Sequence, residues 1–160
     1  MFEIDNNADA PVAALWREHS QALLGYATIL IGPSDANDIV VEAFMRAAPA
    51  VARGDVDHPR AWFIRAVTNQ AHDLRRARRR RWKRDLAALT EAAATETNEF
   101  VDVQRAVAAL SLSQRAVVYL AYWEDMSERS IADVLQLSPG TIRRHLVRAR
   151  IHLRKALNDD

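Results

Sequence analysis

The stretch SERSIADVLQLSPGTIRRHLVRARIHLR, residues 127–154, predicts a helix, a tight turn and a second helix. Its first part carries apolar residues at helical spacing, which would give one helix an apolar face: Ile131, Ala132, Leu135 and Leu137. Ser138 can then cap a new helix, and Pro139 fits the first helical position because its missing N–H has no helical partner there. We therefore expect two short helices joined by a capped turn.

The second of these helices has two different faces. The residues expected to pack inward are Ile142, Leu146, Ala149 and Leu153. The residues left for solvent or a polyanion are Arg143, Arg144, His145, Arg148 and Arg150. Arginine can bond guanine edges bidentately and can also neutralise phosphates, so this helix suits the major groove of DNA. An ordinary exposed arginine face is the alternative, and the capped turn favours the helix-turn-helix.

Basic charge is gathered in two blocks of the chain, although the formal net charge is only +1. Residues 1–59 carry three basic and nine acidic side chains (−6), and residues 60–84 carry ten and one (+9). Residues 85–128 carry two and eight (−6), and residues 129–160 carry seven and three (+4). Two basic blocks predict two contacts with a polyanion.

Composition excludes several classes of protein. With no cysteine, neither a disulfide nor a thiolate metal site or nucleophile is possible. The apolar run 27–31 is closed by Gly32-Pro33 and falls short of the roughly 18 residues of a membrane span. The acidic start MFEIDNNADAP does not resemble a signal peptide, so we expect a cytoplasmic protein without membrane insertion.

Helical spacing also organises the first half of the chain. Residues 11–31 form an amphipathic pattern that ends at Gly32-Pro33. Ser34-Asp35 is expected to cap a second helix, which Pro49 should end or kink near Ala48. A turn-rich loop follows at residues 53–60.

A long helix is expected from Pro59 to about Arg84. Its inner stripe comprises Trp62, Phe63, Ala66, Val67, Gln70 and Leu74. Eight of the ten positions from Arg75 to Arg84 are basic, a run that repels itself unless a counter-charge such as phosphate is present. Aromatic residues beside a basic track favour binding of single-stranded or opened nucleic acid, whereas a localisation-like run or a flexible tail are the alternatives.

The second half predicts an all-α fold with two small domains. Residues 85–100 form an acidic linker, followed by a helix from Val101 to Ala109. Ser113 is expected to cap the next helix, which supports the helix-turn-helix. The expected domains therefore span residues 10–84 and 101–157.

Three segments, in this order and spacing, resemble the extracytoplasmic-function (ECF, group IV) sigma factors of the sigma-70 family. Residues 35–47 are similar to the segment that docks on the polymerase β′ clamp helices, and residues 60–81 to the helix that opens and reads the −10 element. Residues 110–157 resemble the fourth sigma domain, which reads the −35 element. The first expected domain then corresponds to sigma domain 2, and the second to sigma domain 4.

The resemblance implies a sigma factor that binds core RNA polymerase and promoter DNA, without catalysis, cofactor or metal. Its polymerase contacts would include the β′ clamp helices and the β flap, and the free chain would be a monomer. Members of this family are commonly held by an anti-sigma factor, which makes one a candidate partner. We also expect the acidic end Asn158-Asp159-Asp160 to disfavour recognition by a Clp-type protease.

Position by position, the resemblance assigns three sets of residues. The polymerase-binding set comprises Asp35, Asp38, Ile39, Glu42 and Phe44. The −10 set comprises Asp57, His58, Trp62, Arg65, Asn69, Arg75 and Arg76. The −35 set comprises Gly140, Thr141, Arg143, Arg144, Val147 and Arg148.

The chain departs from the family pattern at three places. Ala48-Pro49 stands where the family usually continues a helix, and Leu135-Gln136-Leu137 replaces the usual glycine before the turn. Arg144-His145 is an unusual pair in the reading helix and predicts a promoter sequence of its own.

Two other functions remain open. A helix-turn-helix regulator whose N-terminal helices dimerise or sense a ligand would bind a symmetric operator without polymerase. A small hydrolase would use Asp35, Asp38 and Glu42 with a histidine such as His19, but these carboxylates share one helix face without a metal-binding spacing.

Overall fold

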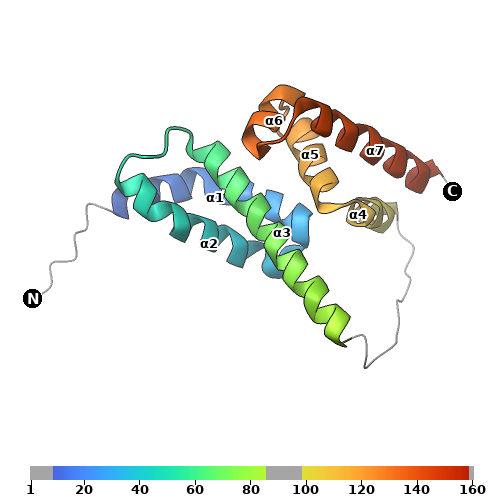
Figure 1. The fold of residues 1–160 in the computed structure, drawn as a ribbon, viewed down its shortest axis with the longest axis horizontal. Helices are drawn as coiled ribbons and strands as arrows, with labels where there is room; N and C mark the ends of the chain where they lie inside the picture. The colour runs from blue at the N-terminus through green and yellow to red at the C-terminus, as the bar shows by residue number, and fades with distance from the viewer. Residues whose placement is uncertain (1–8, 86–98, 159–160) are drawn as a thin grey trace, which may run out of the picture. The chain divides into compact units, whose positions relative to one another are not determined.

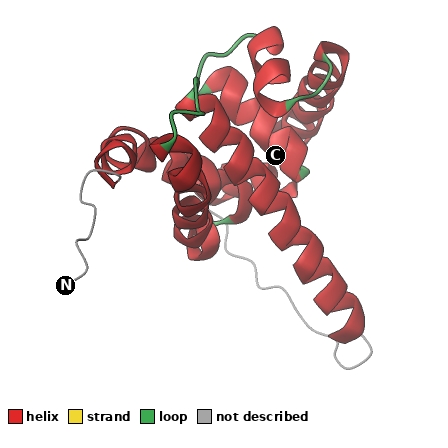
Figure 2. Ribbon diagram, turned by 60° about the vertical axis from the view of Figure 1, so that its left-hand side comes forward, coloured by secondary structure: helices red, strands yellow, loops and turns green. Residues whose placement is uncertain are grey.

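The computed structural model describes residues 9–85 and 99–158, and every regular element in these ranges is a helix. The all-α prediction is confirmed: Figure 1 shows the order of the helices along the chain, and the described part of Figure 2 contains helices and loops only. The described helices are α1 (Asp9–Ile31), α2 (Pro33–Ala52), α3 (Pro59–Asp85), α4 (Glu99–Ala109), α5 (Leu112–Tyr122), α6 (Glu128–Leu135) and α7 (Pro139–Asn158). The chain divides into two compact units, residues 1–71 and 72–160. The predicted acidic linker lies almost entirely outside the described residues.

A single residue, Gly32, connects α1 to α2. Its backbone angles, φ 89° and ψ 165°, fall in a region that is accessible essentially only to glycine. This conformation lets the chain reverse at once, so that α1 and α2 pack along each other. The expected cap at Ser34-Asp35 is wrong, because α2 already begins at Pro33 and its N-terminus has no side-chain cap. Asp35 instead places a negative charge in the first turn, where the helix dipole favours it.

Pro49 is expected to end or kink α2 near Ala48, but α2 continues through it to Ala52, so the expected end is wrong. Pro49 cannot donate to the carbonyl of Met45, and both residues lie on the exposed side of α2. The end of the helix is closed beyond the proline, where the Asp55 N–H donates to the Ala50 carbonyl at 2.9 Å. The loop predicted from Arg53 onward then leads to Pro59, the first residue of α3.

An aromatic cluster attaches α3 to α1 and α2. Phe63 is 1% exposed and stacks on Phe44 of α2, with ring centroids 4.0 Å apart. Trp16 of α1 meets Phe44 edge-on at 4.8 Å. One turn and a half further along α3, the buried Thr68 hydroxyl lies 2.8 Å from the hydroxyl of Tyr26 in α1. The predicted inner stripe of this helix is confirmed, since its members are buried or half-buried.

The second unit is built around α7, which contacts α4, α5 and α6. Its core includes Leu110, Leu120, Ile131 and Ile142, each at most 1% exposed. Two expectations are corrected here, both at helix ends.

The cap of α5 is Ser111 rather than Ser113. The Ser111 hydroxyl accepts from the Gln114 N–H at 3.2 Å, and the Gln114 side chain accepts from the Ser111 N–H at 2.9 Å. This reciprocal pair satisfies two otherwise orphan donors, which Ser113 inside the helix cannot do. Leu137, expected on the apolar face of α6, lies beyond the end of that helix and is 41% exposed.

Candidate nucleic-acid interface

The turn between α6 and α7 forms without the glycine that commonly occupies it. Gln136 adopts a left-handed conformation (φ 55°, ψ 44°), and the Leu137 N–H donates to the Ala132 carbonyl at 3.0 Å. A non-glycine residue in this conformation costs roughly 1 kcal/mol. The departure at residues 135–137 therefore keeps a left-handed helix end, at some cost in stability.

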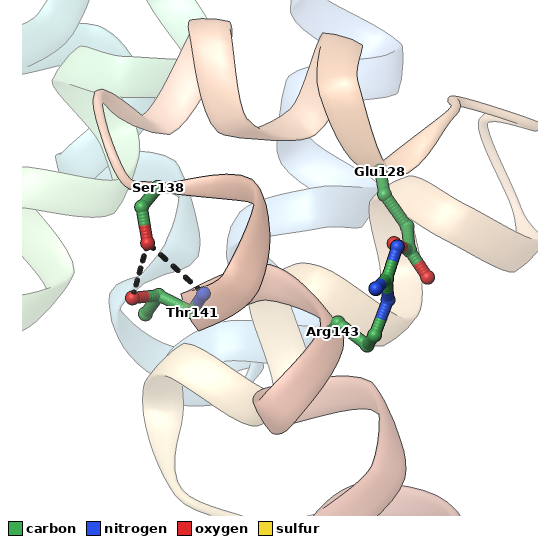
Figure 3. Close-up of polar contacts among 4 residues, drawn as sticks. All are labelled: Glu128, Ser138, Thr141 and Arg143. Carbon is green, nitrogen blue, oxygen red and sulfur yellow. Dashed lines mark hydrogen bonds and ion pairs between the residues drawn. The ribbon is translucent and has the colours of Figure 1, made fainter.

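Ser138 caps α7, as predicted. Its hydroxyl accepts from the Thr141 N–H at 3.1 Å and lies 2.9 Å from the Thr141 hydroxyl. Figure 3 marks both contacts with dashed lines. The cap satisfies one of the orphan donors at the start of the helix and fixes its first turn. Gly140 and Thr141, both in the predicted −35 set, lie in this turn.

The rest of α7 separates into the two faces that the sequence predicts. Ile142, Leu146 and Ala149 are at most 3% exposed, and Leu153 is half-buried. The remaining members of the −35 set are all exposed: Arg143, Arg144, Val147 and Arg148. One helix thus presents these side chains together on its outer side.

Two residues outside the predicted set hold arginines of α7 in place. The Arg143 Nε donates to the Glu128 carboxylate at 3.1 Å, and both side chains face each other in Figure 3. The Arg150 Nε donates to the Tyr122 hydroxyl at 2.5 Å, with its guanidinium 5.6 Å from the ring centroid. Glu128 and Tyr122 come from α6 and α5, and no local spacing in the sequence links them to α7.

Histidine 145 lies half-buried among the arginines of α7. Burial, and then the charges of Arg144 and Arg148, lower its pKa below 6.5. The imidazole is therefore neutral at pH 7, so the unusual Arg144-His145 pair carries one charge rather than two.

The predicted −10 set lies on α3 and the loop before it. Asp57 and His58 are exposed in the loop, and Asn69 is exposed on α3. Trp62 and Arg65 are half-buried, and their three- and four-residue spacing places them on the same side as Asn69 and Arg76. Arg75 is also exposed, although helical spacing puts it on a different side of α3. The structure thus brings four of the seven residues onto one side of this helix.

Beyond Leu74, the side chains of α3 are mostly arginine. Every arginine from Arg75 to Arg81 is exposed, and Arg76 pairs with Asp73 at 2.9 Å. His72 precedes this run, and burial together with the charges of Arg76 and Arg75 lowers its pKa. The predicted helix therefore persists through the basic run.

The predicted polymerase-binding set divides into buried and outward-facing residues. Ile39 and Phe44 are 5% and 3% exposed, so they support α2 from inside. Asp38 and Glu42 are exposed, Asp35 is half-buried, and Glu42 pairs with Arg46 at 2.6 Å.

Two apolar residues of α2 were missed by the sequence reasoning. Val41 is 39% exposed and Met45 is 70% exposed, next to the acidic positions. The signal was available, because both residues fall outside the inward stripe that the sequence pattern gives this helix.

Residues of the alternative hydrolase do not converge on a site. His19 is buried against the aromatic cluster, with its ring 6.1 Å from that of Phe63. Its recorded ion-pair neighbour is Glu18, at 3.7 Å, rather than a carboxylate of α2. Within residues 9–85 and 99–158, no group of three or more histidine or acidic side chains is placed to hold a metal ion. The same described ranges contain no helix long and apolar enough to cross a membrane.

Two helical units, one of them with a capped helix-turn-helix and an arginine face, define a class of DNA-binding transcription proteins. Residues 15–81 match the family model of Sigma-70 region 2, and residues 100–153 match that of Sigma-70, region 4. The ECF RNA polymerase sigma factor SigL of Mycobacterium tuberculosis (strain ATCC 25618 / H37Rv) is 33% identical over 164 residues, covering 94% of this chain and 90% of SigL. The ECF RNA polymerase sigma factor SigW of Bacillus subtilis (strain 168) is 30% identical over 147 residues, covering 78% and 76% of the two chains.

Solved structures show the same fold. The sigma factor RpoE in complex with the anti-sigma factor NepR from Bartonella quintana matches with a TM-score of 0.73 at 22% identity, over 92% of this chain and 97% of that one. CnrH in complex with the cytosolic domain of CnrY matches with a TM-score of 0.65 at 28% identity, over 93% and 88%. The chain belongs to the ECF sigma factors of the sigma-70 family. It is accordingly a factor of transcription initiation, in a family of non-catalytic proteins.

Proposed function

We propose that this chain binds core RNA polymerase and directs it to promoters by reading two DNA elements with two different helices. In this proposal α7 reads the −35 element, and α3 with its preceding loop binds the −10 element and helps to open it. The observation that carries the proposal is the arrangement of α7, whose apolar face is buried while Arg143, Arg144 and Arg148 are exposed behind a capped turn. Such a helix offers its N-terminal half to base edges in the major groove.

The −10 role rests on the composition of α3. Flipping a base out of a duplex costs a few kcal/mol, which a stacking surface and a basic cradle offset. Trp62 and Asn69 lie on one side of α3. The exposed loop residues Asp57 and His58 precede this helix in the chain, and the basic run begins at Arg75. The helix therefore supplies an aromatic ring, a polar amide and dense positive charge along one element.

The polymerase contact is proposed on the outer face of α2. Asp38 and Glu42 supply carboxylates, and Val41 and Met45 supply apolar area beside them. The β flap of the polymerase and an anti-sigma factor are further proposed partners, the latter supported by the structural neighbour solved with NepR. The proposed place of action is the cytoplasm, where RNA polymerase works, and the proposed free form is a monomer. A Clp-type protease remains an expectation, because Asp159 and Asp160 lie outside the described residues.

The proposal is tested by gel filtration of the chain with core RNA polymerase, followed by run-off transcription from a pool of genomic fragments. We expect co-elution and a restricted set of transcripts that disappear in Asn69→Ala and in Arg148→Ala. Arg17→Ala, which removes an exposed arginine of α1, is the matched control and should leave the transcripts unchanged. Absence of co-elution, together with tight binding to a palindromic duplex, would instead establish a conventional helix-turn-helix regulator.

A further inference from the structure

The ion pair between α6 and α7 distinguishes Arg143 from the other arginines of the recognition helix. Its Nε lies 3.1 Å from Oε2 of Glu128, and the two residues are 15 positions apart in the chain. Within the part of the chain that the structure describes, Arg144 and Arg148 make no ion pair. Arg143 is thus the member of the predicted −35 set whose guanidinium is held by a carboxylate.

The ion pair leaves the two terminal nitrogens of the Arg143 guanidinium available to bind DNA. A guanidinium has five N–H donors, one on Nε and two on each terminal nitrogen, so the bond to Glu128 uses only the first. The Arg143 side chain remains 71% exposed, whereas that of Glu128 is 38% exposed. The terminal nitrogens can therefore still make the bidentate contact that guanine O6 and N7 accept.

The pair joins two fixed points of the fold. Glu128 is the first residue of α6, directly after its cap Ser127, whose hydroxyl accepts from the Ser130 N–H at 3.1 Å. Arg143 lies two residues beyond Thr141, which the Ser138 cap holds. Glu128 therefore stands in one capped first turn and Arg143 directly follows another, which restricts the orientation of the arginine.

We propose that Glu128 is a positioning and specificity-determining residue, which orients Arg143 for one base of the −35 element and removes most of its charge from sequence-independent DNA binding. The inference rests on the proposed reading of the −35 element by α7. A surface ion pair contributes little to stability, so its main effect is expected on orientation and on the local field. A carboxylate beside an arginine weakens attraction to phosphate at any sequence but keeps the directional bond to the right base.

This proposal predicts two effects of opposite sign when Glu128 is neutralised. The holoenzyme, formed from the full chain and core RNA polymerase, is presented with a promoter library randomised in the −35 region, and bound templates are sequenced. Glu128→Gln should reduce, by roughly threefold or more, the base preference at the position whose preference Arg143→Ala erases. At the other positions of the −35 region, the base preferences should equal those of the wild type.

The second effect is a gain in binding without sequence preference. For non-specific duplex, affinity should rise in Glu128→Gln, and the slope of log K against log salt should steepen by up to about 0.9, the value for one additional phosphate contact. A variant that merely damaged the fold would lose affinity instead. Asp133→Asn removes a carboxylate from the exposed side of the same helix and should change neither the profile nor the preference at that base.

The outcomes separate the two proposals. If Arg143→Ala erases a base preference and Glu128→Gln leaves it intact, the positioning role of Glu128 is wrong while the reading of the −35 element by α7 stands. If Arg143→Ala leaves every preference unchanged, Arg143 reads no base and both statements about this residue fall. An equal loss at all positions in Glu128→Gln would also overturn the inference, because it would indicate a structural role only.

Discussion

Helices α3 and α7 are both amphipathic and arginine-rich, yet they hold their arginines differently. In α3 the packing residues and most of the basic residues follow one another: Phe63 and Val67 are buried, and the dense run of exposed arginines begins at Arg75. In α7 they alternate around the helix, so that Ile142 and Leu146 are buried while Arg143 and Arg148 are exposed within the same turns.

This difference indicates two ways of using positive charge. An arginine of α7 sits directly over a packed turn, and its neighbours fix its position, as Glu128 does for Arg143. The arginines from Arg75 to Arg81 of α3 lie beyond the aromatic cluster, and we expect them to act chiefly through their summed field. We expect base selection from the first arrangement and sequence-independent attraction from the second.

The largest expected effect tests the anchoring of α3. Phe63→Ala removes a ring stacked on Phe44 and should reduce the free energy of unfolding of the first unit by about 3–5 kcal/mol. Urea unfolding, followed by tryptophan fluorescence, measures the change, with Phe63→Leu as the milder control. A loss below about 1 kcal/mol would show that the aromatic cluster does not anchor this helix.

The next effect separates base-specific contacts from sequence-independent electrostatic attraction. Arg148→Ala in α7 should cost about 1–3 kcal/mol at a matched −35 site and relax the preference for one base. Arg79→Ala with Arg81→Ala in α3 should weaken binding about equally for all sequences and reduce the salt slope by roughly 2. Fluorescence anisotropy of holoenzyme on promoter duplexes, over a series of salt concentrations, measures both.

The reverse pattern would break the comparison between the helices. A sequence-dependent loss in the α3 double variant would mean that its exposed run reads bases. A loss that is uniform across sequences in Arg148→Ala would mean that α7 contributes only charge.

Sequence reasoning found the helices because their apolar spacing is a local signal, and it found the long helix α3 nearly to its last residue. It was wrong where two local signals compete. Ser111 and Ser113 both precede an apolar run, and only the reciprocal bonds with Gln114 decide for Ser111. Pro49 is a helix breaker by itself, yet α2 continues through it to Ala52, with Pro49 on the exposed side of the helix.

For the candidate site, spacing could place Arg143 and Arg148 on the outer face of α7, which the structure bears out. It could not supply Glu128 or Tyr122, since these contacts join residues 15 and 28 positions apart and depend on how the helices pack. The family resemblance placed Ile39 and Phe44 in the polymerase-binding set with the acidic residues of α2, and both lie in the core, where they can only support that contact.

A smaller effect tests the cap that fixes the reading helix. Ser138→Ala should lower the free energy of unfolding of the second unit by about 1 kcal/mol, because the Thr141 N–H loses its acceptor. Ser111→Ala should cost a similar amount at α5. Ser113→Ala, inside α5, is the control and should be close to neutral in chemical denaturation; a larger loss than in Ser111→Ala would reverse the assignment of the cap.

The smallest effect concerns two histidines, His72 on α3 and His145 on α7. His72 and His145 have pKa values below 6.5 in the folded chain, so the unfolded chain binds more protons as the pH falls through this range. The contribution of these two histidines to the free energy of unfolding should therefore be fully present above pH 6.5. It should decrease as the pH falls from there toward their folded-state pKa values. His145→Gln should flatten this decrease in the second unit, and His72→Gln should do so for α3, in denaturation curves recorded between pH 5 and pH 8 at about 0.5-unit steps. Identical pH dependence in wild type and both variants would contradict the assignment.

The exposed run on α3 also has a linear charge density of its own. Six arginines occupy the seven positions from Arg75 to Arg81. A helix rises about 1.5 Å per residue, so one positive charge falls on roughly every 1.7 Å of its axis. Duplex DNA carries one negative charge per about 1.7 Å, and over this short length the two polymers are nearly matched in density and opposite in sign. Away from DNA, this segment gathers whatever small anions or polyanions surround it, so nucleic acid is expected to accompany the protein through purification at low salt.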